Sequence, residues 1–391
     1  MQILHVIRSM RAQAGGPTFA LRQMATSLEQ IGAHSNIACY EAEDGDVGPG
    51  GQTPTVPVFV FRGGSPVELL RPTQPRLRDL VARADIIHLH GIWDPILIVA
   101  AREARGMGKP QVLSPHGMLS PWSMARHRFR KFPYYHLFTR PMLQCVAAIH
   151  FVTEMEAELA AGRLPVDVPR FIAPIFPAEE FYQDPPGRDE ALKYFPNLPA
   201  SGPWVLFLSR IHPGKGLPEI ISAFPSVLKE FPSAQLIVAG SGAPAYVAEM
   251  RGLVARAGII GCTHFIGLVS GAGKIALYRR ASILAVPSSH ENFGMVFVES
   301  LACCTPVLIT PETGIGSEIL KAGAGFSTQA SVAALSRDLP AALRDRERLE
   351  EAGAAGRRWV MDQLCPARAA GRLLEGYTKH ISRGNQREAM Q

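Results

Sequence analysis

Short apolar runs alternate with helix-length amphipathic segments along nearly the whole chain, and this alternation constrains the fold more than any other feature. A first series of apolar runs covers 3–7, 36–40, 85–90, 111–117 and 147–153. A proline-rich, irregular stretch over 168–203 interrupts it, and a second series covers 204–210, 234–242, 263–270, 281–289 and 304–312. Strands that alternate with helices are typical of parallel βαβ layers. The sequence therefore predicts an α/β protein with two Rossmann-like parallel-sheet domains.

The spacing of the two series also predicts the domain organisation. We expect a Rossmann-like N-terminal domain over 1–180, a linker over 181–203 and a second Rossmann-like domain over 204–365. The segment 366–391 is expected to form a C-terminal helix and tail that return to the N-terminal domain. A chain of 391 residues that is 47% hydrophobic and 19% charged is long and apolar enough for two cores, and too apolar for disorder.

Charge and cysteine content restrict the function classes only weakly. A formal net charge of +6 favours anionic partners such as phosphates or membrane surfaces, and no nucleic-acid-binding module is recognisable. The six cysteines show no Cys-x-x-Cys spacing, which favours reduced thiols in the cytoplasm. No stretch approaches the roughly 20 apolar residues of a membrane span.

The stretch FLSRIHPGKGLPEII, residues 207–221, places two cations where a buried strand ends. Arg210 closes the strand, and Lys215 stands between two glycines in a tight turn before the next helix. A guanidinium fork and an ammonium point charge suit neighbouring oxygens of a diphosphate. A solvated surface turn is the alternative that this motif alone leaves open.

A second motif, HENFGMVFVESLACCTPV at 290–307, contains two glutamates that are separated by seven residues. Glu291 follows a predicted strand, and Glu299 lies inside the helix after it. Eight helical positions advance the chain by about 12 Å, so the two carboxylates are too far apart for the close pair of a retaining glycosidase. They suit different hydroxyl groups of one elongated ligand, and ordinary exposed glutamates are the alternative.

Together these motifs resemble glycosyltransferase family 4, the retaining enzymes of GT-B fold that use nucleotide sugars. The resemblance extends to AQAGGPTFALRQMATSLEQIGAH (12–34), DIIHLHGIWDP (85–95) and LSPHGML (113–119). It implies the GT-B architecture, in which the two Rossmann-like domains face each other across a cleft. One departure is Cys304, because similar enzymes usually have glycine there.

The resemblance implies a role for each matching residue. Arg210 and Lys215 would bind the donor diphosphate, Glu299 the ribose and Glu291 the transferred hexose, while His116 would lie against a hexose hydroxyl. The donor pocket would also include the following residues: Gly15, Gly16, Asn292, Phe293, Gly294 and Met295.

The implied reaction is the retaining transfer of a hexose-type sugar from a UDP- or GDP-linked donor to a glycan or lipid-diphosphate-linked acceptor, in bacterial-type surface polysaccharide or glycolipid synthesis. Fixed cations would neutralise the departing diphosphate, so no metal or other cofactor is expected. A nucleotide-sugar epimerase or a phosphorylase on the same fold is the alternative among enzymes. A non-catalytic sugar-nucleotide-binding subunit is the alternative from another class.

Several segments imitate other sites. GLVSGAGKI (267–275) imitates a phosphate-binding P-loop, but its glycine spacing is one residue too long and isoleucine replaces the magnesium-binding Ser or Thr. His88 and His90 share one face of a predicted strand, and no third metal ligand is spaced nearby in the sequence. Asp44 and Asp46 lie in a glycine-rich segment that we interpret as solvated. We therefore expect no metal site.

A basic and aromatic stretch covers 121–140. It is either a solvated helix face or a surface that brings the N-terminal, acceptor-side domain to an anionic membrane, in which case the protein is peripheral at the inner face of the membrane. The candidate acceptor or membrane residues are Trp93, Arg126, Arg128, Arg130 and Lys131.

Overall fold

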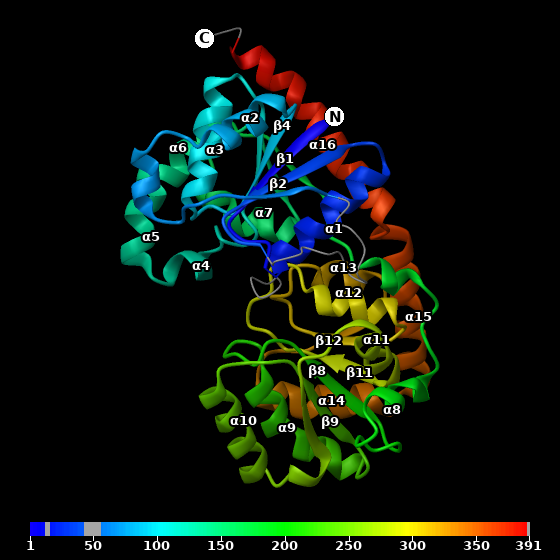
Figure 1. The fold of residues 1–391 in the computed structure, drawn as a ribbon. Coiled ribbons are helices and arrows are strands. Elements are labelled where there is room, and N and C mark those ends of the chain that lie inside the picture. Colours follow the sequence, from blue (N-terminus) through cyan, green and yellow to red (C-terminus); the bar gives the residue numbers. More distant parts are fainter. Residues whose placement is uncertain (12–15, 43–55, 389–391) are drawn as a thin grey trace. The chain divides into compact units, whose positions relative to one another are not determined.

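The computed structural model describes residues 1–11, 16–42 and 56–388, and the chain divides into two compact units. The first unit comprises Met1–Phe176 together with Cys365–Gln391, and the second comprises Pro177–Leu364. Each unit is built around one parallel sheet (Figure 1).

The sheet of the first unit has seven strands in the order β3-β2-β1-β4-β5-β6-β7, all parallel. The strands are β1 (Gln2–Ile7), β2 (His34–Cys39), β3 (Val58–Val60), β4 (Ile86–His90), β5 (Gln111–Ser114), β6 (Ala148–Phe151) and β7 (Arg170–Ile172). The five predicted strands are confirmed. The sequence missed β3 and β7, which have three residues each and lie at the two edges of the sheet.

Helices that follow the strands complete the first unit. They are α1 (Gly16–Gln30), α2 (Pro75–Arg83), α3 (Pro95–Gly106), α4 (Pro121–Ala125), α5 (Arg128–Tyr134), α6 (Arg140–Cys145), α7 (Glu154–Ala160) and α16 (Pro366–Glu388). The apolar face of α3, which includes Ile96, Leu97 and Ala100, packs with Leu89 of β4 in the main core of the unit. Burial of a leucine or isoleucine side chain contributes roughly 1.5–3 kcal/mol to folding.

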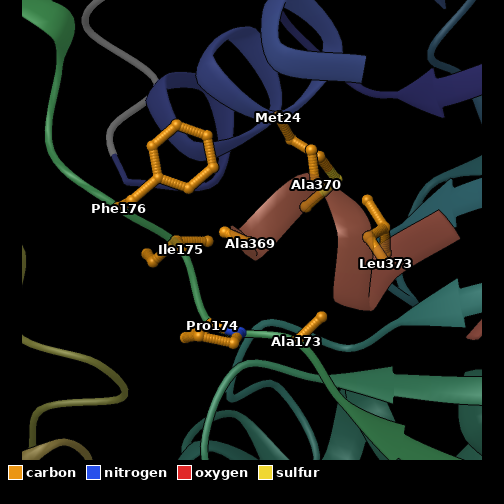
Figure 2. A pocket seen from close by; sticks show the side chains of 8 residues that line it. All are labelled: Met24, Ala173, Pro174, Ile175, Phe176, Ala369, Ala370 and Leu373. Carbon is orange, nitrogen blue, oxygen red and sulfur yellow. The ribbon is translucent and has the colours of Figure 1, made fainter. Parts of the chain in front are cut away.

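The C-terminal helix α16 belongs to the first unit. Leu373 and Tyr377 of this helix lie in one buried cluster with Met24 of α1. Figure 2 shows Met24, Ala370 and Leu373 around a small apolar cavity of about 10 Å³, which the chain after β7 closes. A side chain at Gly376 would place its Cβ 2.4 Å from the ring of Phe171 on β7, so the helix lies directly against the sheet edge.

The second unit has a six-stranded parallel sheet in the order β10-β9-β8-β11-β12-β13. The strands are β8 (Trp204–Leu208), β9 (Gln235–Ala239), β10 (Thr263–Gly267), β11 (Ile283–Ala285), β12 (Val307–Ile309) and β13 (Gly325–Ser327). The five predicted strands are again confirmed, and the three-residue edge strand β13 was missed.

The helices of the second unit are α8 (Ala191–Tyr194), α9 (Leu217–Glu230), α10 (Pro244–Arg256), α11 (Gly271–Arg280), α12 (Met295–Ala302), α13 (Gly316–Lys321), α14 (Val332–Arg344) and α15 (Arg346–Gln363). The segment 181–203, which we expected to be a linker, lies in this unit and carries α8, which contacts α11.

The strand order reverses once in each sheet, between β1 and β4 in the first unit and between β8 and β11 in the second. In open parallel sheets, ligands bind beyond the carboxyl ends of the strands at this reversal, because the loops on either side separate there. Loops that follow β8 and β11 are therefore the place to look for a ligand site in the second unit.

Candidate functional site

The loop after β8 carries Lys215 and is shaped by two glycines. Gly214 has φ +90° and Gly216 has φ +79°, a backbone region that side chains disfavour. A Cβ on Gly216 would lie 2.4 Å from the carbonyl oxygen of Pro287, so this loop packs closely on the segment after β11. The backbone N–H of Ser289 donates a hydrogen bond to the carbonyl of Gly214 and ties the same two loops together.

Lys215 and Glu291 meet at the point where the strand order reverses. The Nζ of Lys215 lies 2.5 Å from Oε2 of Glu291, and the two side chains are only 14% and 21% exposed. The lysine follows β8 and the glutamate follows β11, its neighbour in the sheet. The ammonium group is thus held in place by a carboxylate at the carboxyl edge of the sheet.

The predicted donor-pocket segment 291–295 is fixed by the loop after β12. The N–H of Gly314 donates to the carbonyl of Glu291, and the N–H of Ile315 donates to the carbonyl of Phe293. A Cβ at Gly314 would lie 1.8 Å from the carbonyl oxygen of Asn292, so the two segments touch through their backbones. Gly294, with φ +98°, immediately precedes α12, whose first residue is Met295.

Glu299 lies on α12 and is almost fully buried, with 3% of its side chain exposed. Its Oε2 receives two partners from α11: the Nζ of Lys274 at 2.6 Å and the hydroxyl of Tyr278, which donates at 2.8 Å. Its Oε1 has no hydrogen-bond partner within 1–11, 16–42 and 56–388. The carboxylate is therefore oriented through one oxygen, and the other oxygen is available to a ligand hydroxyl.

Lys274 is a functional candidate that the sequence reasoning missed, because its segment was considered only as an unsuccessful P-loop. Its Nζ also lies 5.7 Å from the ring centroid of Phe181 and 5.9 Å from that of Tyr278, so aromatic faces surround the cation on two sides. The available signal was the spacing of Lys274 and Tyr278, four residues apart on one helix face.

Arg210 follows β8 and is exposed, and in the part of the chain that the structure describes it makes no hydrogen bond or ion pair. The next residue, Ile211, lines a pocket of about 420 Å³ at the carboxyl ends of β8, β9 and β10. Residues that line it include Ile211, Gly240, Gly242, Pro244, Phe265 and Gly267. Arg251 of α10 also lines the pocket, with its guanidinium carbon 4.5 Å from the centroid of the Phe265 ring.

In the first unit, His116 follows β5 in an unusual backbone conformation with φ +49°. The next residue, Gly117, donates its N–H to Oε1 of the buried Glu156 at 2.5 Å, and the N–H of Val152 donates to the other carboxylate oxygen at 2.9 Å. Glu156 thus joins the His-Gly loop to the end of β6. A left-handed residue costs roughly 1–2 kcal/mol, and these contacts offset that cost.

Of the two predicted glycines of the N-terminal loop, only Gly16 is described, and Gly15 lies outside the described residues. Gly16 begins α1, and a Cβ placed on it would meet no atom within 4 Å. Asp44 and Asp46 also lie outside the described residues.

Several strands of the first unit carry buried histidines. Two of them, His88 on β4 and His150 on β6, belong to one continuous row of hydrogen bonds. The Nδ1 of His88 lies 2.6 Å from the hydroxyl of Tyr377, and its Nε2 lies 2.7 Å from Oγ of Ser114. That hydroxyl lies 2.7 Å from Nδ1 of His150, whose Nε2 lies 2.8 Å from the carbonyl of Ala173.

The carbonyl of Ala173 fixes the direction of this row, because a carbonyl can only accept. His150 must carry its proton on Nε2, so Ser114 donates to its Nδ1 and itself accepts from Nε2–H of His88. The bare Nδ1 of His88 then accepts from the hydroxyl of Tyr377. Every group in the row is satisfied while both imidazoles are neutral, and burial lowers the pKa of His150 to about 4.

The structure also brings His5 next to His88 and His90, so the third histidine that the sequence spacing lacked is present. One nitrogen from each of the three lies within 4.8 Å of the others, a separation that a metal site would allow. Both nitrogens of His88 already have the partners described above, and those of His90 lie 3.1 Å from His5 and 3.0 Å from His116. A metal would have to break these contacts, so the donors fit a metal poorly.

The basic and aromatic stretch forms two short helices, α4 and α5, the turn that joins them and a π-helical segment over Tyr135–Thr139 that leads into α6. We call its exposed members the basic–aromatic patch: Trp122, Arg126, Arg128, Phe129, Arg130 and Phe132. Phe129 is 80% exposed and Phe132 is 64% exposed. Lys131 was expected to belong to this exposed surface, but its Nζ donates to the carbonyl of Ser123 at 2.5 Å and lies 5.3 Å from the centroid of the Trp93 ring.

Within the described residues, no helix combines the length and apolarity needed to cross a membrane.

The chain matches known protein families in both units. Residues 15–173 match the family described as glycosyl transferase 4-like domain, and residues 189–359 match the family described as glycosyl transferases group 1. Among curated proteins, the GDP-mannose-dependent alpha-(1-6)-phosphatidylinositol monomannoside mannosyltransferase of Mycobacterium tuberculosis is 29% identical over 78% of this chain and 79% of its own length. The phosphatidyl-myo-inositol mannosyltransferase of Mycobacterium leprae is 34% identical over 40% of this chain and 42% of its own.

Solved structures give the same fold at lower identity. Anabaena HepE, crystallised with UDP and glucose, aligns over 97% of this chain and 100% of its own with a TM-score of 0.78 and 18% identity. WaaG, a glycosyltransferase involved in lipopolysaccharide biosynthesis, aligns over 94% of this chain and 98% of its own with a TM-score of 0.71 and 17% identity. The two parallel sheets, the paired lysine and glutamate motifs and these matches lead to one conclusion: the chain belongs to glycosyltransferase family 4 and is a glycosyltransferase of GT-B fold.

Proposed function

We propose that this glycosyltransferase moves a hexose from a nucleotide diphosphate sugar to a glycan or lipid-linked acceptor with retention of anomeric configuration and without a metal ion. The observation that carries the proposal is the pair of Lys215 and Glu291 at the strand-order reversal of the second unit. In this proposal Lys215 and Arg210 bind the diphosphate, and Glu291 binds the transferred hexose.

The remaining donor contacts follow from the same sheet edge. Glu299 offers Oε1 to the ribose hydroxyls, since Lys274 and Tyr278 occupy Oε2. The pocket that includes Gly240, Gly242 and Gly267 receives the nucleotide base. Glycine at these positions supports backbone recognition of a flat ring, because no side chain limits its approach.

The chemistry needs a fixed positive charge near the leaving group. Breaking the bond between sugar and phosphate develops negative charge on the diphosphate, and preoriented cations stabilise that charge without reorganising. Lys215 meets this requirement, because Glu291 orients its ammonium group and both side chains are mostly buried. In retaining transfer the acceptor attacks the same face of the sugar that the diphosphate leaves, and the departing phosphate takes the acceptor proton.

The donor and acceptor classes are supported by the relatives. The mycobacterial relative is named as GDP-mannose-dependent and acts on a phosphatidylinositol mannoside, and the HepE structures contain UDP or UDP-glucose. The basic–aromatic patch supports a lipid-linked acceptor, because exposed phenylalanines and arginines together bind anionic interfaces. The protein would then work as a peripheral protein at the inner face of the membrane.

The donor assignment is tested by thermal stabilisation with UDP, GDP, UDP-glucose and GDP-mannose, since a ligand that binds the folded state raises its stability by mass action. The stabilising sugar nucleotide is then supplied with lipid extract in the presence and absence of EDTA. Lys215→Ala should retain the fold and lose at least about tenfold in transfer rate. Near wild-type turnover of this variant, or loss of activity with EDTA, would contradict the proposal.

Membrane binding is tested by co-sedimentation with anionic vesicles. The double variant R128E/R130E reverses two charges of the basic–aromatic patch, and R83E/R105E makes the same charge change at exposed positions on α2 and α3. We expect the first variant to lose binding and the second to retain it. Equal binding by both would show that the patch is only a solvated face.

A further inference from the structure

A second row of histidines in the first unit ends at the residue that the family resemblance places against the sugar. The Nδ1 of His5 on β1 lies 3.1 Å from Nε2 of His90 on β4, and Nδ1 of His90 lies 3.0 Å from Nε2 of His116. The rings of His90 and His116 are stacked, with an interplanar angle of 18°. The row therefore joins the buried centre of the sheet to the His-Gly loop.

In such a row all rings must carry their proton on the same ring nitrogen, so that every hydrogen bond runs in the same direction. Each gap between two nitrogens holds one proton, and a neutral imidazole carries one proton on one of its two nitrogens. Burial lowers the pKa of both His5 and His116 to about 3, and that of His90 also falls well below its usual range, so all three rings are neutral at pH 7. Either every ring is protonated on Nδ1, or every ring is protonated on Nε2.

The buried end of the row selects between these two orders. The Nε2 of His5 is buried and has no hydrogen-bond partner. A proton there would be a buried donor without an acceptor, and orphaned N–H groups are rarer in proteins than under-used acceptors. The favoured order leaves Nε2 of His5 bare, so His5 donates from Nδ1 to His90 and His90 donates from Nδ1 to His116.

We propose that His5 and His90 are positioning residues that hold His116 as a neutral Nδ1–H donor toward an oxygen of the bound sugar. The Nε2 of His116 is occupied as an acceptor, and its Nδ1 has no partner in the described part of the chain. The backbone supports the same role, because Glu156 holds the loop through Gly117. This inference rests on the proposed function for its substrate, but the proton position does not depend on it.

The proton position is measured directly in the full-length protein with ¹⁵N-labelled histidine. Two-bond ¹H–¹⁵N correlation distinguishes the protonated nitrogen of each ring from the bare one, and the spectrum of His116→Gln identifies the His116 signals. We expect a protonated Nδ1 and a bare Nε2 at pH 7. A protonated Nε2 or a doubly protonated ring on His116 would overturn the proposal.

Variants of His90 and His5 test whether the row controls His116. His90→Leu removes the donor to Nε2 of His116, so His116 should populate both proton positions and the rate of transfer should fall about three- to tenfold. His90→Asn keeps an N–H near the place of Nδ1, so it should restore both readouts. His5→Asp places an acceptor opposite Nε2 of His90, so His90 should donate from Nε2 and the His116 proton should move to its own Nε2. An unchanged His116 spectrum in His90→Leu and in His5→Asp would overturn the proposal.

His150→Gln is the matched control. It alters an equally buried histidine of the other row and should leave the His116 spectrum unchanged; a shifted His116 proton in this variant would contradict control by His5 and His90. Binding of UDP and GDP to His90→Leu should stay within about twofold of wild type, since the row faces the sugar. Absence of transfer from every donor in the wild-type protein would defeat the proposed function, and the spectrum would still decide the proton position.

Discussion

Lys215 and Glu291 lie 76 positions apart in the sequence, and their side chains form a mostly buried ion pair with 2.5 Å between Nζ and Oε2. The pair exists because β8 and β11 are neighbours in the sheet although β9, β10 and three helices separate them along the chain. Each partner therefore determines where the other is held when a ligand arrives.

This relationship predicts non-additive kinetics. Lys215→Met and Glu291→Gln should each lower kcat/KM at least about tenfold, and the double variant should be close to the worse single variant, because residues in contact couple by roughly 0.5–3 kcal/mol. Steady-state transfer assays on the four proteins measure the coupling. Lys229→Met, at an exposed lysine of α9, is the control for loss of charge. Fully additive losses would show that the two side chains act independently.

The buried carboxylate of Glu299 predicts a stability effect. Lys274→Met should lower the free energy of unfolding by about 2 kcal/mol, because removing one partner leaves a buried charge with poorer compensation. Tyr278→Phe removes only one neutral donor and should cost about 1 kcal/mol. Urea unfolding of both variants gives these values. An equally stable Lys274→Met would mean that the lysine contributes nothing to holding the carboxylate.

The buried histidines predict acid lability. Burial lowers their pKa in the folded state, to about 3 for His5 and about 4 for His150, whereas the unfolded chain takes up protons near pH 6.5. Above pH 6.5 neither state is protonated, so stability is complete. As the pH falls from 6.5 toward 4, the unfolded state alone binds protons, and each such histidine costs about 1.4 kcal/mol per pH unit.

Urea midpoints at pH 7.5, 6.0 and 5.0 measure this dependence. His150→Gln should make the slope shallower by the equivalent of one proton. A pH-independent midpoint in the wild type over this range would contradict the buried neutral rows.

Two glycines of α16 give a matched test of its docking. Gly376→Ala should destabilise the protein by about 1–3 kcal/mol, because the added Cβ would lie 2.4 Å from the Phe171 ring. Gly371→Ala, where a Cβ would meet nothing within 4 Å, should stabilise it by about 0.5–1 kcal/mol through helix propensity. Thermal unfolding of the two variants should move in opposite directions, and equal shifts would mean that α16 does not pack on β7.

Cys304 predicts a stabilising change. It has φ +58°, which explains why similar enzymes have glycine there. Cys304→Gly should raise the free energy of unfolding by about 0.5–1 kcal/mol, whereas Cys304→Ala keeps a Cβ and should not. The urea midpoints of the two variants separate the relief of backbone strain at position 304 from the loss of the thiol. Equal shifts of the midpoint in both variants would show that the effect comes from the thiol.

The sequence predicted what depends on local pattern. Ten strands have apolar runs, and these were found, including the three-residue strands β11 and β12, which are fully buried. The strands β3, β7 and β13 are equally short but lie at sheet edges and are only partly buried, so their apolar pattern is weak. The motifs indicated Lys215, Glu291 and Glu299 because their spacing is local.

What the sequence could not supply was pairing across strands and helices. Lys274 and Glu299 lie on α11 and α12, and only packing of these helices joins them. His5 pairs in register with His88, but that register follows only once β1 and β4 are known to be neighbours. A sequence signal did exist, since His5, His88, His90 and His150 are polar residues within otherwise apolar strands.

The hydrogen bond between Tyr377 and His88 has a consequence for biosynthesis. A ribosome makes β1 through β7 early, yet the side chain that caps His88 emerges only after the whole second unit has been translated. The half of the molecule that is synthesised first is thus finished last. Until then, the apolar groove that receives α16 stays open to water, and a nascent or truncated chain that stops before residue 365 would expose it to chaperones and proteases.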